Sequence, residues 1–390
     1  MNKYLIVNTG SASKKYSLYE NESEVAFFHF ESEETGFVYT FRHQSEKTKV
    51  KITEKEFNNS IDLLLSILIK NAFISSKNDI KTVGVRVVAP GIYFEDNRFI
   101  DKEFIDNMKK AGRKAPLHVD AIFKEIEKLV KVFGKKFPMV GISDSAFHKD
   151  MPVKSKLYAI PLSDAKKHEI LRFGFHGISL GSIVNKLKAN NKLTSRIVVC
   201  HIGGGVSITA IKDGKSFDTS MGFTPLEGMV MATRVGDIDS GAVAYLSEIL
   251  KLKGNNLLKY LNKKCGLLGL SDGLSDDVRE LIKAEGENVD AKNALDIYAY
   301  KIQKQIGAYA VALGGLDMLV FSGTVGERSF KMRERICNGL GALGITLNIE
   351  KNNATDGVDA NISGTESKIF VEVVKTDEMA QIVKETIAQK

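Results

Sequence analysis

Cysteine is scarce in this sequence, and long apolar runs are missing. The three cysteines, Cys200, Cys265 and Cys337, are far apart and odd in number, which argues against both a disulfide framework and a zinc site. The longest apolar run, 61–69, contains a serine and ends at a lysine, so it is too short to cross a bilayer. The first residues, MNKYLIVNTG, lack the apolar region and cleavage site of a signal peptide. We therefore expect a cytoplasmic protein with no membrane partner.

Several common binding motifs are missing as well. The formal net charge is +7, but the lysines are interleaved with Glu and Asp and form no arginine-rich or aromatic-basic motif, so we expect no nucleic-acid partner. No GxGxxG follows an expected strand, which argues against a dinucleotide-binding dehydrogenase. Gly214-Lys215-Ser216 is not a Walker A loop, because Thr209 stands where its first glycine should be. A modestly positive chain suits a small anionic substrate or a nucleotide.

Length and composition favour a globular protein of two domains. The chain has 390 residues, of which 43% are hydrophobic and 26% charged, enough for a sizeable core. A pattern of strand, small polar turn and strand occurs twice. Its two copies are 4–7, 8–15 and 16–19, then 196–201, 202–205 and 206–211. A duplicated hairpin with tight turns offers backbone N–H groups that can hold phosphate.

The rest of the chain alternates helical and strand patterns. Helical spacing predicts helices over 54–72, 118–133 and 294–313, and strands are expected at 82–89, 138–142 and 318–321. The glycine-bearing turn 322–327 follows the last of these strands. A turn in that place puts backbone donors at the carboxyl end of a strand, where open α/β sheets bind ligands.

The stretch from Phe217 to Gly241 is unusual for its small residues. It contains one arginine, Arg234, among glycines, threonines and the acidic residues Asp218, Glu227, Asp237 and Asp239. So many small residues suit backbone that lies close to a ligand, and the arginine suggests an anion. An arginine between acidic groups is also often a satisfied surface charge that contributes little.

The run DTSMGFTPLEG, followed by TR and GDID, resembles the signature of the acetate kinases, the acetokinase family of short-chain carboxylate kinases. The resemblance extends over nearly the whole chain. It implies an α/β protein with the two-domain actin-like (ribonuclease H-like) fold, which has a duplicated core and a cleft between its lobes. In the family the end of the chain returns to the first domain. We therefore expect domains at 1–148 with 380–390 and at 149–379, the second binding nucleotide and forming a homodimer.

The same resemblance implies the reaction and its catalytic residues. The family transfers the γ-phosphoryl group of ATP to acetate or a similar acid. Asp144 of GISDSAFH would orient the acid, His176 of RFGFHG would stabilise the transition state, and Arg86 and Arg234 would meet across the cleft around the phosphoryl group. The substrate-binding residues implied are Arg86, Val88, Leu117, His118, Phe175 and Pro225.

The resemblance also implies a nucleotide and a metal site. The metal ligands of a Mg²⁺ or Mn²⁺ ion would be Asn8 and Glu378. The residues for ATP or ADP would be Ser11, Ser13 and Lys15, then His201, Ile202, Gly203, Gly204 and Gly205, then Asp277, Val278 and Arg279, and finally Thr324, Val325, Gly326, Glu327 and Arg328.

Three motifs depart from the family pattern and leave alternatives open. HRVVHGG is Val85–Gly91 here without its two histidines, CHLGNG has Gly204 in place of asparagine, and AGIGEN has Thr324 in place of a glycine. The last two changes lie on the donor side, so a smaller donor such as pyrophosphate is an alternative to ATP. Propionate or butyrate is an alternative acid, and a ligand-binding homologue without turnover is a third possibility.

One further motif points to a different enzyme class. Residues 177–181 fit GxSxG, the nucleophile elbow of serine hydrolases. That motif requires a strand leading directly into it, and 172–176 makes a poor strand. We therefore favour a carboxylate kinase over a hydrolase.

Overall fold

The structure is a computed structural model that describes residues 1–10, 13–33 and 35–389, without the side chain of His118. The chain divides into two compact units. Unit 1 comprises Met1–Ala146, Gly177–Ser182 and Asp377–Lys390, and unit 2 comprises Phe147–His176 and Ile183–Thr376. No helix among the described residues is long and apolar enough to span a membrane. This division into compact units does not test the domain boundaries expected from the sequence, which remain a prediction.

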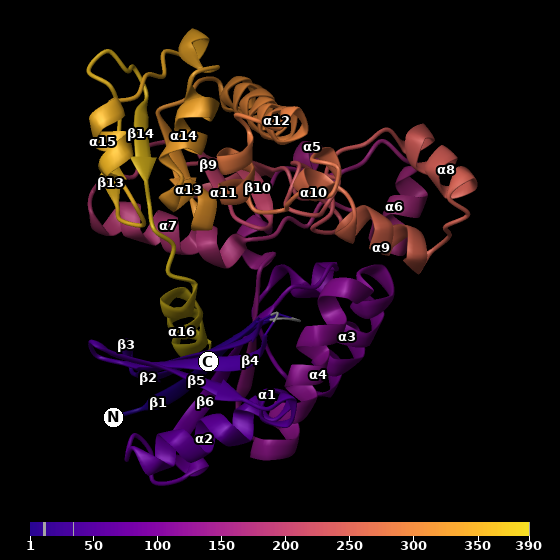
Figure 1. Cartoon of the computed structure of the whole chain (residues 1–390). Coiled ribbons are helices and arrows are strands. Elements are labelled where there is room, and N and C mark those ends of the chain that lie inside the picture. Colours follow the sequence, from indigo (N-terminus) through magenta and orange to yellow (C-terminus); the bar gives the residue numbers. More distant parts are fainter. Residues whose placement is uncertain (11–12, 34, 390) are drawn as a thin grey trace. The chain divides into compact units, whose positions relative to one another are not determined.

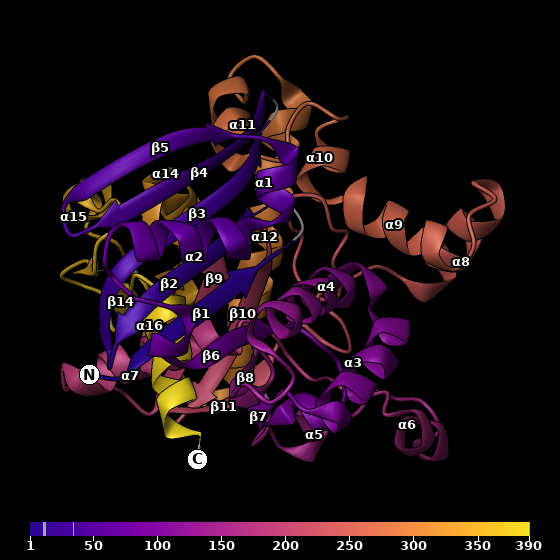
Figure 2. The ribbon, with the colours of Figure 1, turned by 90° about the horizontal axis from the view of Figure 1, so that it is seen from below.

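Unit 1 is built on an eight-stranded sheet in the order β5-β4-β3-β2-β1-β6-β8-β7 (Figures 1 and 2). Strands β1 to β5 form an antiparallel meander, and β6 and β8 run parallel to β1. The strands are β1 (Lys3–Thr9), β2 (Ser13–Glu20), β3 (Ser23–Glu33), β4 (Gly36–His43), β5 (Glu46–Ile52), β6 (Ile80–Val87), β7 (Arg98–Phe99) and β8 (Met139–Ser143).

Helices cover the two faces of this sheet with different side chains. Its helices are α1 (Glu54–Asn58), α2 (Ser60–Lys70), α3 (Lys102–Lys114), α4 (Pro116–Phe133) and α16 (Glu378–Ala388). Leu5 and Val7 of β1 pack in the core under α2 and α4, whereas Tyr4 and Ile6 pack against α16. Figure 1 shows α16 and α2 on opposite sides of the sheet, and Figure 2 shows α2 in front of β2 and β3.

The ends of these helices follow from capping residues in the sequence. Thr53 and Glu56 form a reciprocal capping box at the start of α1, and the carboxylate of Asp101 accepts a hydrogen bond from the backbone of Phe104 at the start of α3. Pro116 occupies the first turn of α4, where its missing N–H costs nothing.

Unit 2 contains a six-stranded sheet in the order β11-β10-β9-β12-β14-β13. The strands are β9 (Arg196–Ile202), β10 (Val206–Lys212), β11 (Lys215–Thr219), β12 (Met318–Ser322), β13 (Ala360–Asn361) and β14 (Phe370–Val373). The helices are α5 (Val153–Lys156), α6 (Leu162–His168), α8 (Ser240–Ile249), α9 (Asn255–Lys263), α10 (Gly266–Leu270), α11 (Val278–Ala284), α12 (Val289–Leu313), α13 (Gly323–Arg328), α14 (Phe330–Cys337) and α15 (Ile349–Ala354). Helices α8 and α9 extend away from the sheet in both ribbon views (Figures 1 and 2).

The two sheets repeat one topology. In unit 1, β1 pairs antiparallel with β2 and parallel with β6, and β6 pairs parallel with β8. In unit 2, β9 pairs in the same way with β10 and β12, and β12 pairs parallel with β14. The second strand of each hairpin also pairs antiparallel with a fifth strand, β3 in unit 1 and β11 in unit 2. The duplicated hairpin predicted from the sequence is therefore the first element of a duplicated five-strand core.

Three local predictions need correction. The helix expected over 54–72 is two helices that meet at Asn59. The expected turn 8–15 is shorter, because Asn8 belongs to β1 and residues 13–15 belong to β2. The expected turn 322–327 is mostly helical, since α13 begins at Gly323, directly after β12.

The structure also rules out a nucleophile elbow at residues 177–181. Residues 177–181 form the start of α7 (Gly177–Ala189), no strand precedes them, and Ser179 is fully buried. A serine inside a helix has none of the exposure that a nucleophile elbow provides.

Candidate active site

Four polar side chains of unit 1 converge where its parallel strands end. Asn8 lies at the end of β1, Arg86 near the end of β6, Asp144 directly after β8, and Glu378 at the start of α16. Arg86 Nε and Nη2 donate to the two Asp144 carboxylate oxygens at 3.2 and 2.8 Å. Arg86 Nη1 donates to Asn8 Oδ1 at 3.2 Å and to Glu378 Oε2 at 3.3 Å, and Asn8 Nδ2 donates to Glu378 Oε2 at 2.8 Å.

Strand alternation explains why these side chains share a face. A Cβ on Gly84 would lie 2.1 Å from Thr386 Oγ1 of α16, so Gly84 faces α16. Arg86, two residues on, points to the same side. Asn8 is likewise two residues beyond Ile6, which packs against α16. The sequence therefore places a charge in a β-branched strand on the one face where carboxylates can meet it.

Charge pairing dominates the electrostatics of this network. Burial lowers the pKa of Arg86, but the negative charges of Asp144 and Glu378 outweigh it, so the pKa is raised overall. Asp144 is 1% exposed, and the arginine fixes both of its oxygens. Such a bidentate arrangement sets the direction of a carboxylate as well as its charge.

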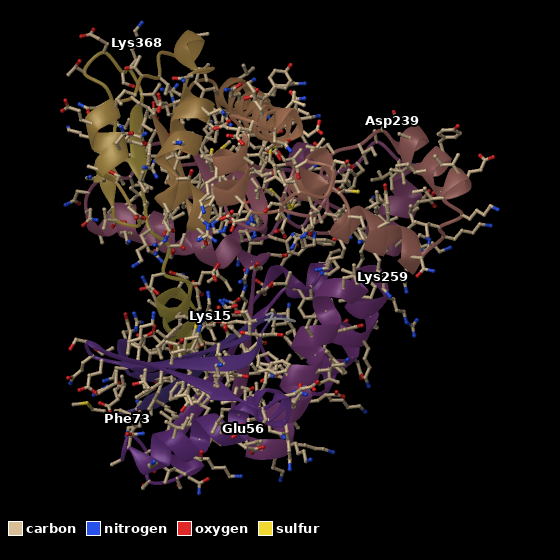
Figure 3. The ribbon with its side chains drawn as sticks, viewed as in Figure 1. Lys15, Glu56, Phe73, Asp239, Lys259 and Lys368 are labelled. Carbon is tan, nitrogen blue, oxygen red and sulfur yellow. The ribbon has the colours of Figure 1, made fainter. Side chains whose placement is uncertain are left out.

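The hairpin residues predicted to bind phosphate lie beside this network, with one exception. Lys15 is the cross-strand partner of Asn8, and Ser13 begins β2 on the same face. Figure 3 shows Lys15 on the α16 side of the sheet, away from Glu56 and Phe73. Ser11 lies outside the described residues.

Arg234 lies in an irregular segment of unit 2 and has no ion pair with any residue that the structure describes. Its Nη1 donates to the Pro225 carbonyl oxygen at 3.2 Å and lies 3.5 Å from Met231 Sδ. Burial lowers the pKa of its guanidinium, with no anion to oppose that shift. A partly buried cation of this kind is expected to bind an anion from solution.

His176 and Gly205 lie beside this arginine, and His201 lies beside His176. A Cβ on Gly205 would lie 3.3 Å from His176 Nε2 and 3.4 Å from Arg234 Nη1, so glycine leaves room for both side chains. His176 has the left-handed φ of 60° directly before α7, and its Nδ1 lies 2.9 Å from Ser207 Oγ. The rings of His176 and His201 are 4.3 Å apart.

The glycine turn after β9 packs against the start of α13. A Cβ on Gly323 would lie 2.8 Å from the Ile202 carbonyl oxygen, and one on Gly203 would lie 3.9 Å from the Thr324 nitrogen. Gly204 is exposed with open space around it. The two segments predicted to contact nucleotide, 201–205 and 324–328, are therefore neighbours in unit 2.

The side chains of α13 have different surroundings. Thr324 is exposed and Val325 is half-buried, whereas Gly326 is buried. Glu327 is 7% exposed, and its Oε1 accepts hydrogen bonds from the backbone of Gly323 at 3.1 Å and of Thr376 at 3.0 Å. Its carboxylate therefore holds the turn together. Arg328 is exposed and lies 3.8 Å from Asp356.

The remaining predicted residues are more scattered. Asp277 caps α11 and pairs with Arg279 at 2.6 Å, while Val278 is buried; no side-chain hydrogen bond between described residues joins them to the glycine turn.

The residues predicted to line the alkyl pocket fall in both units. In unit 1, Val88 packs against the core, Leu117 is 36% exposed, and His118 belongs to α4, its side chain being left undescribed; in unit 2, Phe175 and Pro225 are buried.

The acidic residues around Arg234 in the sequence have other partners. Arg172 Nη2 binds Glu227 Oε1 at 2.5 Å, and its Nη1 donates to the Thr219 carbonyl oxygen at 2.9 Å. Tyr158 donates to the other Glu227 oxygen. Sequence reasoning missed this network because Arg172 precedes the segment by some fifty residues. Gly222 is packed closely against this network, because a Cβ added to it would clash with Tyr158 and Glu227.

The chain was compared with known proteins. Residues 3–384 match the Acetokinase family. An acetate kinase of Phocaeicola vulgatus is 39% identical over 396 residues, covering 99% of each chain. The crystal structure of Porphyromonas gingivalis acetate kinase superposes with a TM-score of 0.86 at 36% identity, covering 100% of this chain and 99% of that one.

A second solved structure, a propionate kinase from Francisella tularensis, gives a TM-score of 0.89 at 32% identity, covering 99% of both chains. These matches confirm the resemblance and the predicted two-domain actin-like α/β fold. The chain belongs to the acetokinase family.

Proposed function

We propose that this protein is an acetate kinase, which transfers the γ-phosphoryl group of ATP reversibly to acetate and yields acetyl phosphate and ADP. Family membership over residues 3–384 supports the reaction class. The observation that carries the proposal is Arg234, a partly buried guanidinium without an ion pair among the described residues and beside His176. Transfer of a phosphoryl group depends on positioned cations of this kind.

Arg234 and His176 would act on the phosphoryl group in transit. A cation without a carboxylate partner has no ion pair to give up when an anion binds. Its interaction with the phosphoryl group becomes stronger as negative charge develops on the equatorial oxygens in the transition state. His176 can donate from its Nε2, because Ser207 lies at its other ring nitrogen. We propose that both groups stabilise the transition state of direct in-line transfer.

Arg86 and Asp144 would orient the acid. A carboxylate substrate is already ionised at neutral pH and needs no general base. Asp144 holds Arg86 through both oxygens, so it keeps the guanidinium aimed along one direction. We propose that Arg86 and Arg234 act on opposite sides of the transferred group, with domains 1–148 and 380–390 closing against 149–379.

The donor set in unit 1 fits a magnesium or manganese ion. Asn8 and Glu378 provide amide and carboxylate oxygens, and Asp144 and Glu378 carry two negative charges against the one of Arg86. Hard divalent ions favour such ligands together with water and substrate phosphates. When bound, the ion would neutralise charge on the phosphate oxygens. We propose Asn8 and Glu378 as its ligands.

The nucleotide phosphates would lie along both hairpins. In unit 2 the candidates are His201, the turn Ile202 to Gly205 and the α13 residues 324–328, with Asp277, Val278 and Arg279 nearer the adenosine. In unit 1 they are Ser11, Ser13 and Lys15. The exposure of Gly204 and Thr324 supports this placement, since backbone donors in such turns bind anions.

A small pocket would receive the alkyl group of the acid. We propose Val88, Leu117, His118, Phe175 and Pro225 as its lining. One methylene changes binding by only about 1–3 kcal/mol, so propionate should be a weaker alternative substrate and not an excluded one. We further propose a cytoplasmic homodimer that binds neither membrane nor nucleic acid.

A hydroxamate assay tests the function. Acetate, ATP and Mg²⁺ should yield acyl phosphate, which hydroxylamine converts into a hydroxamate that forms a coloured complex with ferric iron. A panel of donors that includes pyrophosphate tests the donor, because Gly204 and Thr324 depart from the family pattern, and a panel of acids tests the pocket. If acyl phosphate formed with pyrophosphate but not with ATP, pyrophosphate would replace ATP as the proposed donor. If no donor gave acyl phosphate, a ligand-binding homologue would be favoured.

A further inference from the structure

Two cross-strand rows extend the phosphate-binding hairpin into β3. Asn8 pairs with Lys15, and Lys15 pairs with His29. In the next row Ser13 pairs with Glu31. Tyr16, Phe28 and Phe30 face the core under α2, so the alternate residues Lys15, His29 and Glu31 face the side of the proposed active site.

One hydrogen bond and one ion pair connect three of these side chains. Ser13 Oγ lies 2.7 Å from His29 Nε2, and His29 Nδ1 lies 3.3 Å from Glu31 Oε2. An ionised carboxylate only accepts hydrogen bonds, so Glu31 favours the tautomer with the hydrogen on Nδ1. The bare Nε2 then accepts, and the hydroxyl of Ser13 must donate to it. While His29 is neutral, the hydroxyl hydrogen of Ser13 therefore points to His29, and only the lone pairs of Ser13 Oγ face the proposed active site.

Protonation of His29 reverses this direction. A protonated ring donates from Nε2 to Ser13 Oγ, which frees the hydroxyl hydrogen for a phosphate oxygen. We propose that His29 is a positioning residue for the phosphate donor, and that binding of the donor's phosphates is accompanied by uptake of one proton from solvent at His29 Nε2. The inference rests on the proposed function in one respect, the contact of Ser13 with phosphate.

The charges around His29 suit such coupling. Burial lowers the pKa of His29, and Lys15 on β2 and Lys47 on β5 lower it further, while Glu31 on β3 opposes them. The facing residue on β4 is Thr40, which carries no charge. His29 is therefore neutral at pH 7 without ligand. A phosphate beside Lys15 would add negative charge and would raise the pKa of His29, so that binding and protonation favour each other.

Calorimetry can measure this proton directly. The magnesium complex of a non-hydrolysable ATP analogue is titrated into the full-length protein at pH 7.5, in buffers of different ionisation enthalpy. The unmodified protein should take up roughly half to one proton per analogue bound. His29→Gln should bind the analogue with uptake close to zero, because it removes the titrating ring. Ser13→Ala should bind more weakly and take up less of a proton, because the protonated ring loses its hydrogen-bond acceptor. Glu31→Gln should reduce the uptake, since it removes the group that keeps His29 basic.

His43→Gln is the matched control. His43 is on the neighbouring strand β4, and its Nδ1 bonds the Val25 carbonyl oxygen at 2.7 Å, remote from Ser13. This variant should keep the full proton uptake. Equal uptake by the unmodified protein and His29→Gln would overturn the inference while leaving kinase activity, measured by the hydroxamate assay, intact. If instead no analogue binds and no donor yields hydroxamate, the proposed function fails first.

Discussion

Arg86 holds Asp144 through two parallel hydrogen bonds, from Nε to Oδ1 at 3.2 Å and from Nη2 to Oδ2 at 2.8 Å. Both carboxylate oxygens are therefore committed to one guanidinium, and the carboxylate is 1% exposed. A group held in this way is suited to fixing the direction of its partner. It is poorly placed to collect a proton from a substrate.

Asp144→Asn tests that distinction. Loss of a charge-assisted hydrogen bond of about 1.5–3 kcal/mol should lower kcat by about 10- to 100-fold. As an orienting group, Asp144 should affect the rate equally from pH 5.5 to 8.5. The pH profiles of both proteins are to be compared, and disappearance of an acidic limb in the variant would identify Asp144 as a general base instead.

Arg234→Ala should lower kcat by about 10²–10³-fold and change the KM for acetate much less. The reason is that its negative partner develops fully only in the transition state. Arg234→Lys should recover part of the loss, because it keeps the charge but lacks the planar fork. Steady-state kinetics of the three proteins decide the matter. A normal kcat with weaker acid binding would remove the proposed role.

Gly266→Ala should displace Arg234 without unfolding unit 2. Gly266 has a φ of +66°, and an added Cβ would lie 2.2 Å from the Met231 carbonyl oxygen and 2.8 Å from that of Arg234. Gly273→Ala is the matched control, with a φ of +81° and nothing within 4 Å. Both should cost about 1–3 kcal/mol of backbone strain. Gly266→Ala adds the clash of its Cβ with two backbone carbonyl oxygens, so it should be the less stable variant, and only it should lower kcat strongly. Equal kcat in both variants would contradict this account.

Lys14→Met should destabilise the protein by about 3 kcal/mol in urea unfolding, because it removes the buried cation from the buried carboxylate of Glu125, which then keeps only the more distant and more exposed Lys128, at 4.0 Å. Lys14 Nζ lies 3.4 Å from Glu125 Oε2, and the two residues are 6% and 3% exposed. Tyr16 also donates to Glu125, at 2.5 Å. The double variant Lys14→Met, Glu125→Gln should be more stable than the single one. A single variant as stable as the unmodified protein would show that the pair contributes nothing.

His148 should make the protein less stable in mild acid. Burial lowers the pKa of His148 to about 4, and the ring lies between Ser216 Oγ at 2.7 Å and the Phe175 carbonyl oxygen at 3.0 Å. The unfolded chain binds a proton near pH 6.5 and the folded chain does not, so stability falls as pH drops from about 6.5 to 4. The loss from this group is about 3 kcal/mol.

His148→Gln lacks a titrating group at this position. Its free energy of unfolding should change less between pH 6.5 and 4 than that of the unmodified protein, as measured by urea unfolding at several pH values. Parallel curves for the two proteins would contradict the assignment.

The sequence predicted the local elements of this fold well, because each depends on neighbouring residues. The hairpins of β1 with β2 and of β9 with β10 follow from short apolar runs around polar turns. The meander β3 to β5 was missed, because Val25 to Phe28 are all apolar and the alternation of β3 is visible only in its burial. It carries His29, which therefore had no place among the predicted site residues.

Partners that are distant in the chain could not be predicted. The acids beside Arg234 in the sequence suggested a satisfied charge, yet Glu227 binds Arg172, and Asp239 caps α8. Arg86 was expected to need an anion, but nothing local indicated that two carboxylates, 58 and 292 residues away, would supply it. The duplicated topology brings strand ends together, and only that topology makes these contacts understandable.

The alternating side chains of strand β2 restrict insertions and deletions at the first hairpin. Ser13, Lys14 and Lys15 point alternately to opposite faces, with Lys14 inside the core beside Glu125. A one-residue shift of this strand's register would exchange the buried Lys14 for the half-buried Lys15 and reverse every side chain that follows. Length variation between relatives should therefore be absent here, or should occur in steps of two residues.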